Sequence, residues 1–89
     1  MARKIFKFPI DITGYTTISI SERAKILTLQ IDQKTDEPCI WVEVNTERVL
    51  VERKFVVVAT GISFPDEFNY IGTFQVDGGE FIGHLFEIL

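Results

Sequence analysis

The single histidine, His84, and the single cysteine, Cys39, are the side chains of this 89-residue chain best suited to covalent chemistry. A thiol becomes a nucleophile when an imidazole beside it takes its proton. The two residues fall in different predicted strands, so only tertiary packing would bring them together. Isolated residues of these types are common in cores and on sheet faces, and we therefore predict no catalytic pair.

Carboxylates are the other groups suited to acid–base chemistry, and two adjacent pairs stand out, Asp36–Glu37 and Asp66–Glu67. Both fall in predicted turns, where acidic side chains are usually solvated. A metal site made of the histidine, the cysteine and a carboxylate would have no recognisable ligand spacing. The chain also lacks the phosphate-binding loop and the dinucleotide-binding glycine pattern. We expect no catalytic residues, no metal and no cofactor.

Four side chains are candidates for binding a partner. Aromatic and amphipathic residues dominate binding hot spots, which favours Trp41, Tyr70 and His84. Arg53 is a weaker fourth candidate, as a partner for an anion.

Charge argues against nucleic acid as that partner. Arg3, Lys4 and Lys7 gather near the start, and exposed aromatic rings such as Tyr15 would suit base stacking. The net charge of −4 gives no broad positive field, however. We interpret the three basic residues as protection of an edge strand against aggregation.

The element best defined by sequence is a hairpin near the C-terminus, in which Asp77-Gly78-Gly79 joins two β-forming runs. Residues of these types supply the positive φ angles of a tight turn. Period-two alternation predicts Leu27, Leu29 and Ile31 on one face of a strand, Lys25 to Asp32. The other predicted strands are Lys4 to Phe8, Tyr15 to Ile20, Cys39 to Asn45 and Arg53 to Thr60. Residues 45–52 receive no assignment.

About seven short strands without a convincing helix predict a mainly β fold: a small antiparallel β-sandwich or partly open barrel. We expect residues 1–89 to form a single β domain. The last strand is apolar on both faces, since Ile82, His84, Phe86 and Ile88 oppose Phe81 and Leu85. Such a strand is either central in its own sheet or covered by a second copy, so a homo-oligomer is expected.

The location expected from the sequence is intracellular. One cysteine cannot form an internal disulfide, and nothing requires an oxidising compartment. The N-terminal residues lack the apolar run of a signal peptide, and no stretch approaches the length of a membrane span.

Several segments together resemble a family of small proteins encoded by tailed bacteriophages and prophages. The resemblance runs nearly end to end and is carried by Ala24-Lys25-Ile26-Leu27, Leu29-Gln30, Pro38-Cys39-Ile40-Trp41, Thr60-Gly61, Tyr70-Ile71-Gly72-Thr73-Phe74-Gln75, Gly78-Gly79 and His84-Leu85-Phe86-Glu87. Relatives often place a histidine directly after the Thr-Gly step, where this chain has Ile62. That departure argues against a shared histidine-based chemistry.

The resemblance implies an accessory protein that acts in the host bacterial cytoplasm. The leading hypothesis is a non-catalytic protein that binds a host protein or a small ligand, with interference in host defence as one such role. The first alternative is a structural or assembly component of the virion. The second is a small enzyme acting on a nucleotide or another phosphate compound, which would require His84 to meet a carboxylate or Cys39 in a cleft.

Overall fold

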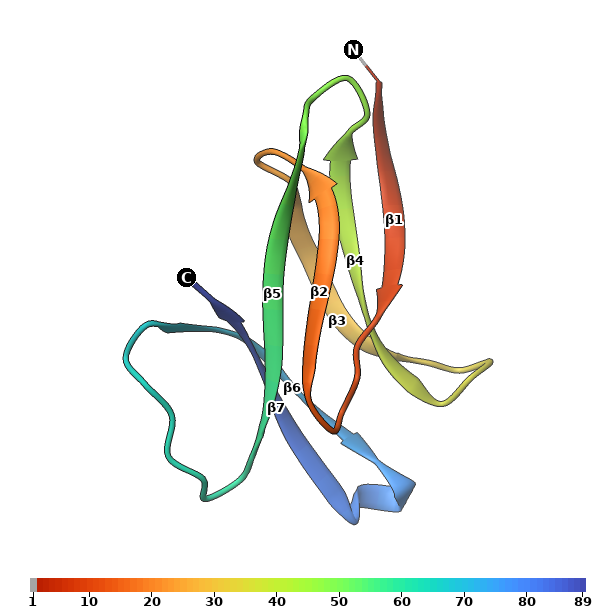
Figure 1. The fold of residues 1–89 in the computed structure, drawn as a ribbon. Helices are drawn as coiled ribbons and strands as arrows, with labels where there is room; N and C mark the ends of the chain where they lie inside the picture. The colour runs from red at the N-terminus through yellow and green to blue at the C-terminus, as the bar shows by residue number, and fades with distance from the viewer. Residues whose placement is uncertain (1) are drawn as a thin grey trace.

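The computed structural model describes residues 2–89 as seven strands in two antiparallel sheets (Figure 1). One sheet has the order β1-β4-β3 and the other the order β2-β5-β7-β6. The predicted fold class, a small antiparallel β-sandwich, is confirmed, and the sheets do not close into a barrel. The strands are β1 (Arg3–Pro9), β2 (Tyr15–Ser21), β3 (Lys25–Asp32), β4 (Glu37–Asn45), β5 (Leu50–Ala59), β6 (Phe68–Val76) and β7 (Phe81–Ile88).

The hydrophobic core lies between the two sheets, because each contributes one apolar face to it. On β4 the alternating residues Ile40, Val42 and Val44 are buried, while Trp41 and Glu43 face outward with partial exposure. Phe55 of β5 and Leu85 of β7 are fully buried opposite them. Alternation therefore fixes which face of each strand is covered.

The β3 strand departs from strict alternation at one residue. The register with β4 shifts between Ile26 and Thr28, so Leu27 is the extra residue of a β-bulge. Ile26 and Leu29 pack against the core, whereas Leu27 is exposed. The prediction that Leu27 shares a face with Leu29 is therefore wrong, because the bulge reverses the alternation at that point.

The predicted C-terminal hairpin is confirmed. Its turn spans Asp77–Gly79, and all three residues have positive φ, at 54°, 66° and 92°. Glycine adopts this region without steric cost, and aspartate is among the few side chains that tolerate it. The turn brings β7 back along β6, and β7 also pairs with β5, which makes the last strand central in its sheet. Self-association stays a prediction.

The segment without an assignment, residues 45–52, contains a turn and the start of β5. Asn45 organises the turn, since its side-chain oxygen accepts a hydrogen bond from the Glu47 amide (3.0 Å). β5 then begins at Leu50, which lies opposite Ser21 of β2 in the antiparallel pair. No helix within residues 2–89 has the length and apolar character required to span a bilayer.

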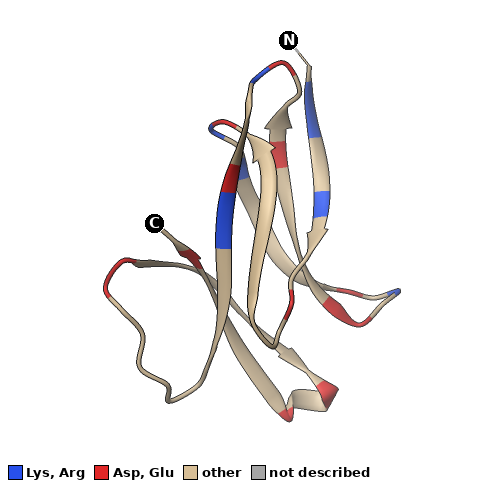
Figure 2. Cartoon of the chain, in the orientation of Figure 1, with Lys and Arg blue, Asp and Glu red and all other residues tan. Residues whose placement is uncertain are grey.

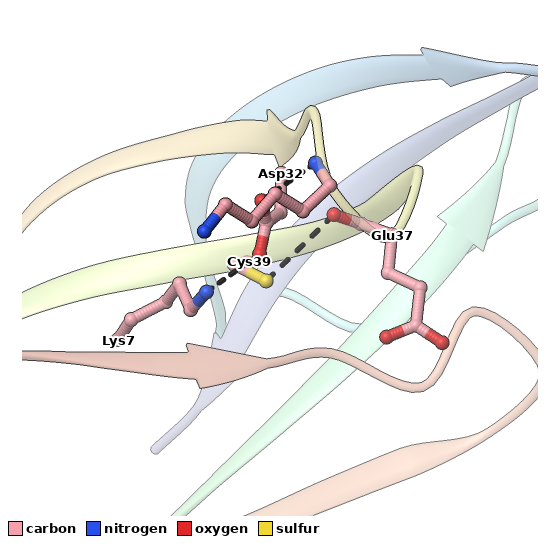
Figure 3. A network of polar contacts seen from close by, with 5 residues as sticks. Lys7, Asp32, Glu37 and Cys39 are labelled. Atoms are coloured by element: carbon pink, nitrogen blue, oxygen red, sulfur yellow. Dashed lines mark hydrogen bonds and ion pairs between the residues drawn. The ribbon is translucent and has the colours of Figure 1, made fainter.

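An ion pair between Lys7 and Asp32 lies over Cys39, on the face of the three-stranded sheet that points away from the core (Figure 3). The Lys7 ammonium donates to the Asp32 carboxylate at 2.6 Å, and the Lys34 amide donates to the same carboxylate at 3.0 Å. The hydrogen bond from Lys7 is the main reason that the pKa of Asp32 lies below its usual value. Burial raises the pKa of the Cys39 thiol, which disfavours the thiolate.

This ion pair predicts a defined loss of stability in acid. Because folding lowers the pKa of Asp32, its contribution is fully present above the ordinary pKa of 3.8 and is lost as pH falls through the lower folded value. Asp32→Asn should therefore flatten the dependence of unfolding free energy on pH below about pH 4. Urea unfolding from pH 2 to 6 measures this, with Asp36→Asn in the same turn as control. Equal slopes for the wild type and Asp32→Asn would contradict the assignment.

Candidate functional site

The β5–β6 loop, residues 60–67, folds over the face of the four-stranded sheet that points away from the core, here called the outer face. Two turns shape the loop: the Ile62 amide donates to the Ala59 carbonyl, and the Phe68 amide donates to the Pro65 carbonyl, both at 3.2 Å. Gly61 provides the positive φ, 91°, that the first turn requires. The second turn follows Phe64 directly.

Phe64 holds this loop against the sheet. Its ring centroid lies 4.4 Å from that of Phe86 on β7, in a tilted arrangement, and 6.5 Å from that of Phe68. Tyr70 packs edge-on against Phe86 from β6, at 5.6 Å. Under these rings Phe86 is only 4% exposed although it lies on the outer face. The aromatic cluster thus covers part of the apolar outer face of β7.

A cleft of about 450 Å³ remains beside the cluster, between the loop and the sheet. We call it the His84 cleft. Its lining residues come from β5, the loop, β6 and β7: Val58, Ala59, Thr60, Gly61, Ile62, Phe64, Tyr70, Thr73, His84 and Phe86. The size falls within the range of small-molecule sites, about 300 to 1,000 Å³.

His84 lies in this cleft with both ring nitrogens hydrogen bonded. Nε2 lies 2.8 Å from Thr60 Oγ1 and Nδ1 lies 2.9 Å from Thr73 Oγ1. The Tyr70 hydroxyl in turn lies 2.6 Å from Thr73 Oγ1. Four polar side chains are therefore joined by one chain of hydrogen bonds that runs from Tyr70 through Thr73 and His84 to Thr60. We call this chain the hydroxyl–imidazole relay.

A β-bulge makes this relay geometrically possible. Residues three apart in a regular strand point to opposite faces, yet Tyr70 and Thr73 share the outer face. The register between β6 and β7 shifts between Tyr70 and Gly72, so that Tyr70 is opposite Phe86 and Thr73 is opposite His84. Ile71 is the extra residue and packs against the core. Bulges recur near functional sites because they redirect a side chain in this way.

Apart from His84, the side chains that line the cleft are uncharged. None of its lining residues is Asp, Glu, Lys or Arg. Lys54 is the last basic residue of the chain except for His84, and the hairpin formed by β6 and β7 is without Lys and Arg in Figure 2. Lys54 is on the outer face too, but four residues before Val58, roughly 13 Å along the strand. The electrostatic setting does not favour an anion.

The structure brings two of the four candidate binding residues together. Tyr70 and His84 both line the cleft and join through Thr73. Trp41 belongs to the other sheet, opposite Lys7 and Thr28. The proposed binding set is thus divided between two faces of the molecule.

Arg53, the fourth candidate, points between the sheets. Its Nε and Nη2 donate to the two carboxylate oxygens of Glu87, each at 2.6 Å, and Nη1 donates to the Ala24 carbonyl at 2.6 Å. The hydrogen bond to Glu87 is the main cause of its raised pKa. A guanidinium engaged on all three nitrogens is a structural tie between β5, β7 and the β2–β3 turn.

Cys39 and His84 do not meet. They lie in different sheets, and the register places Cys39 on the face of β4 that carries Trp41, away from the core. Both nitrogens of His84 bond to threonine hydroxyls rather than to a thiol or a carboxylate. Within residues 2–89, no three or more His, Cys, Asp and Glu side chains are grouped so as to hold a metal ion.

Among the polar and aromatic residues that shape the cleft, the sequence does not predict Thr60, Phe64 and Thr73 as site residues. A glycine within a strand pattern often marks a bulge, so Gly72 was a usable signal that Tyr70 and Thr73 share a face. Nothing comparable marks Thr60 or Phe64, because their positions depend on how the loop folds back.

A second cleft, of about 680 Å³, opens near the β1–β2 connection. Its polar lining is largely acidic, with Asp11, Asp36, Glu37 and Asp77. The Asp11 carboxylate is already bonded within its own turn, to the amide and the hydroxyl of Thr13 at 2.9 and 2.7 Å. These bonds lower the pKa of Asp11 and account for its position without a ligand.

The comparisons with known proteins add a family. A family described as a domain of unknown function (DUF7352) matches residues 1–88, nearly the whole chain. The chain belongs to the DUF7352 family. No curated protein and no solved structure matches it.

Proposed function

We propose that this DUF7352 protein is a non-catalytic binding protein that holds a small molecule in the His84 cleft. The observation that supports this most directly is the bulge at Ile71, which turns Tyr70 and Thr73 toward His84 on one face. Converging polar groups in a cleft with aromatic and aliphatic walls are typical of ligand sites.

The hydrogen bonds of the relay support ligand binding better than they support catalysis. An imidazole that activates a hydroxyl is ordinarily held by a carboxylate, which stabilises the imidazolium formed in the reaction. Here the neutral hydroxyl of Thr73 takes that position at Nδ1 of His84. The geometry thus supports recognition through hydrogen bonds, with Thr60 as a contact rather than a nucleophile.

The biological setting that we propose is an accessory role for a tailed bacteriophage or prophage in the bacterial cytoplasm. Its support is the sequence resemblance carried by segments such as Tyr70 to Gln75 and His84 to Glu87. Those same two segments supply three of the four groups of the relay. Sequestration of a host molecule would interfere with a host response without any catalysis.

Native mass spectrometry tests the proposal. We expect the protein, after incubation with the low-molecular-weight fraction of a bacterial extract, to retain a small molecule that Phe64→Ser releases, since that change removes one wall of the cleft. Phe6→Ser, at a partly exposed phenylalanine of the other sheet, is the matched control and should retain it. Retention of nothing, equal retention by both variants, retention of a host protein alone, or chemical conversion of the bound molecule would each overturn the proposal.

A further inference from the structure

The hydroxyl–imidazole relay has two free ends, and they face the cleft. Thr73 bonds both Tyr70 and His84, and His84 bonds both threonines, so these two interior groups are engaged on both sides. Tyr70 and Thr60 are the ends of the relay, and both side chains are exposed. Each terminal hydroxyl keeps hydrogen-bonding capacity that a ligand can use.

The two ends have opposite hydrogen-bonding character. A neutral imidazole donates from one nitrogen and accepts at the other. If Nε2 of His84 carries the hydrogen, Thr60 accepts it and points its own hydrogen outward. Thr73 then donates to Nδ1 and accepts from Tyr70, which is left with free lone pairs. In the other tautomer every bond reverses, so one end always offers a donor while the other offers an acceptor.

The walls of the cleft suit a planar, uncharged molecule. Ile62, Phe64 and Tyr70 line it and remain 61%, 49% and 57% exposed, so their apolar surface is available for contact. Aromatic rings favour stacked or edge-on contact with another ring. The lining supplies no Lys or Arg to neutralise a phosphate or carboxylate, which an anionic ligand would require.

We propose that the His84 cleft selects a neutral heteroaromatic molecule that presents a hydrogen-bond donor on one side of its ring and an acceptor on another, the chemistry of a nucleobase or its uncharged nucleoside. The inference rests on the proposed function and narrows it to one class of ligand. The ring lies against Phe64 and Tyr70, and its donor and its acceptor meet opposite ends of the relay. Binding then fixes one tautomer of His84.

Nuclear magnetic resonance of the ring nitrogens of His84 tests the inference, and the assignment is unambiguous because the chain has one histidine. We expect guanosine, adenosine, cytidine or uridine to shift the two ring ¹⁵N signals apart, toward a single tautomer. The matching 5′-monophosphates should bind at least about tenfold more weakly, because their phosphate would be desolvated without a cationic partner. Equal or tighter binding of the monophosphates, or unchanged ring signals at saturation, would overturn the inference.

Variants at the relay provide the second test, with matched controls on the same outer face. Tyr70→Phe and Thr73→Val should each weaken nucleoside binding about tenfold, as expected when a hydrogen bond is lost and its partner is left unsatisfied. Thr73→Ser keeps the hydroxyl and should restore binding. Tyr15→Phe and Thr17→Val, on the edge strand β2, should leave it unchanged. If the relay variants bind like the controls, the relay does not select the ligand.

The two proposals fail in different ways. If the molecule retained from the bacterial extract is anionic or aliphatic and Phe64→Ser still releases it, the small-molecule site stands and the nucleobase inference is wrong. If no nucleoside binds and no molecule is retained, both are wrong. Retention of a nucleobase or nucleoside that is sensitive to Tyr70→Phe supports both.

Discussion

Replacing Arg53 with methionine is expected to lower the free energy of unfolding by about 3 kcal/mol, near the lower end of the cost of leaving one partner of a buried ion pair alone. The side chains of Arg53 and Glu87 are 22% and 11% exposed, so water screens the remaining charge only in part. The change also removes the donor to the Ala24 carbonyl. For a domain of this size the midpoint of thermal unfolding should fall by about 10 °C or more.

Two further variants make this prediction specific. Replacing both partners, Arg53→Met with Glu87→Met, should recover more than half of the loss, because no buried charge then lacks a partner. Arg48→Met breaks an exposed pair with Glu22 at 4.0 Å and should cost less than about 1 kcal/mol. Urea unfolding measures all three. An Arg53→Met protein as stable as Arg48→Met would show that the tie between β5 and β7 contributes nothing.

Gly83→Ala is expected to destabilise the protein by about 1 to 3 kcal/mol, the usual cost of adding an atom to a well-packed core. A Cβ at this position would lie 2.5 Å from Cζ of Phe74 and 2.8 Å from Cγ1 of Val57. The Phe74 ring has little room to yield, because it is only 5% exposed. The strand β7 would have to shift, and with it the next residue, His84.

The partner residue provides a rescue for this variant. Phe74→Leu shortens the side chain that blocks the new methyl group, so the double variant should be more stable than the sum of the two single changes implies. Gly14→Ala, where a Cβ would have nothing within 4 Å, is the matched control and should be nearly neutral. Thermal unfolding compares the four variants with the wild type. If Gly83→Ala behaves like Gly14→Ala, close packing of Phe74 against β7 is not what requires glycine.

The strands and the hairpin turn could be predicted because each depends on local chemistry. Ile40, Val42 and Val44 alternate with Trp41 and Glu43, and this spacing alone decides which face of β4 is buried. The Asp77–Gly79 turn likewise follows from residues that tolerate positive φ. Both features would be expected in any fold that covers one side of the sheet.

The bulges at Leu27 and Ile71 were not predicted, because a shift of register depends on the partner strand as well as on the bulged one. The consequence differs between them. At Leu27 the error affects one exposed residue, whereas at Ile71 it hides the link between Tyr70 and Thr73. The chemistry of Tyr70 and His84 identifies both as binding candidates, but the sequence does not indicate that Thr73 connects them.

Contacts between residues far apart in the sequence are the other feature that the sequence does not predict. Arg53 and Glu87 are 34 residues apart, and neither sequence position indicates that the guanidinium points between the sheets rather than toward a ligand. The position of Phe64 over Phe86 depends on the fold of an entire loop. Contacts of this kind follow from tertiary packing, which periodicity does not encode.

The most direct test of the His84 cleft is a map of backbone amide chemical shifts as the low-molecular-weight fraction of a bacterial extract is added to the protein. Ligand binding there predicts that the largest changes fall at Thr60 to Phe64, at Tyr70 to Thr73 and around His84. Changes concentrated instead around Trp41, or in the acidic cleft near Asp11, would contradict the account. So would a spectrum that does not change at all.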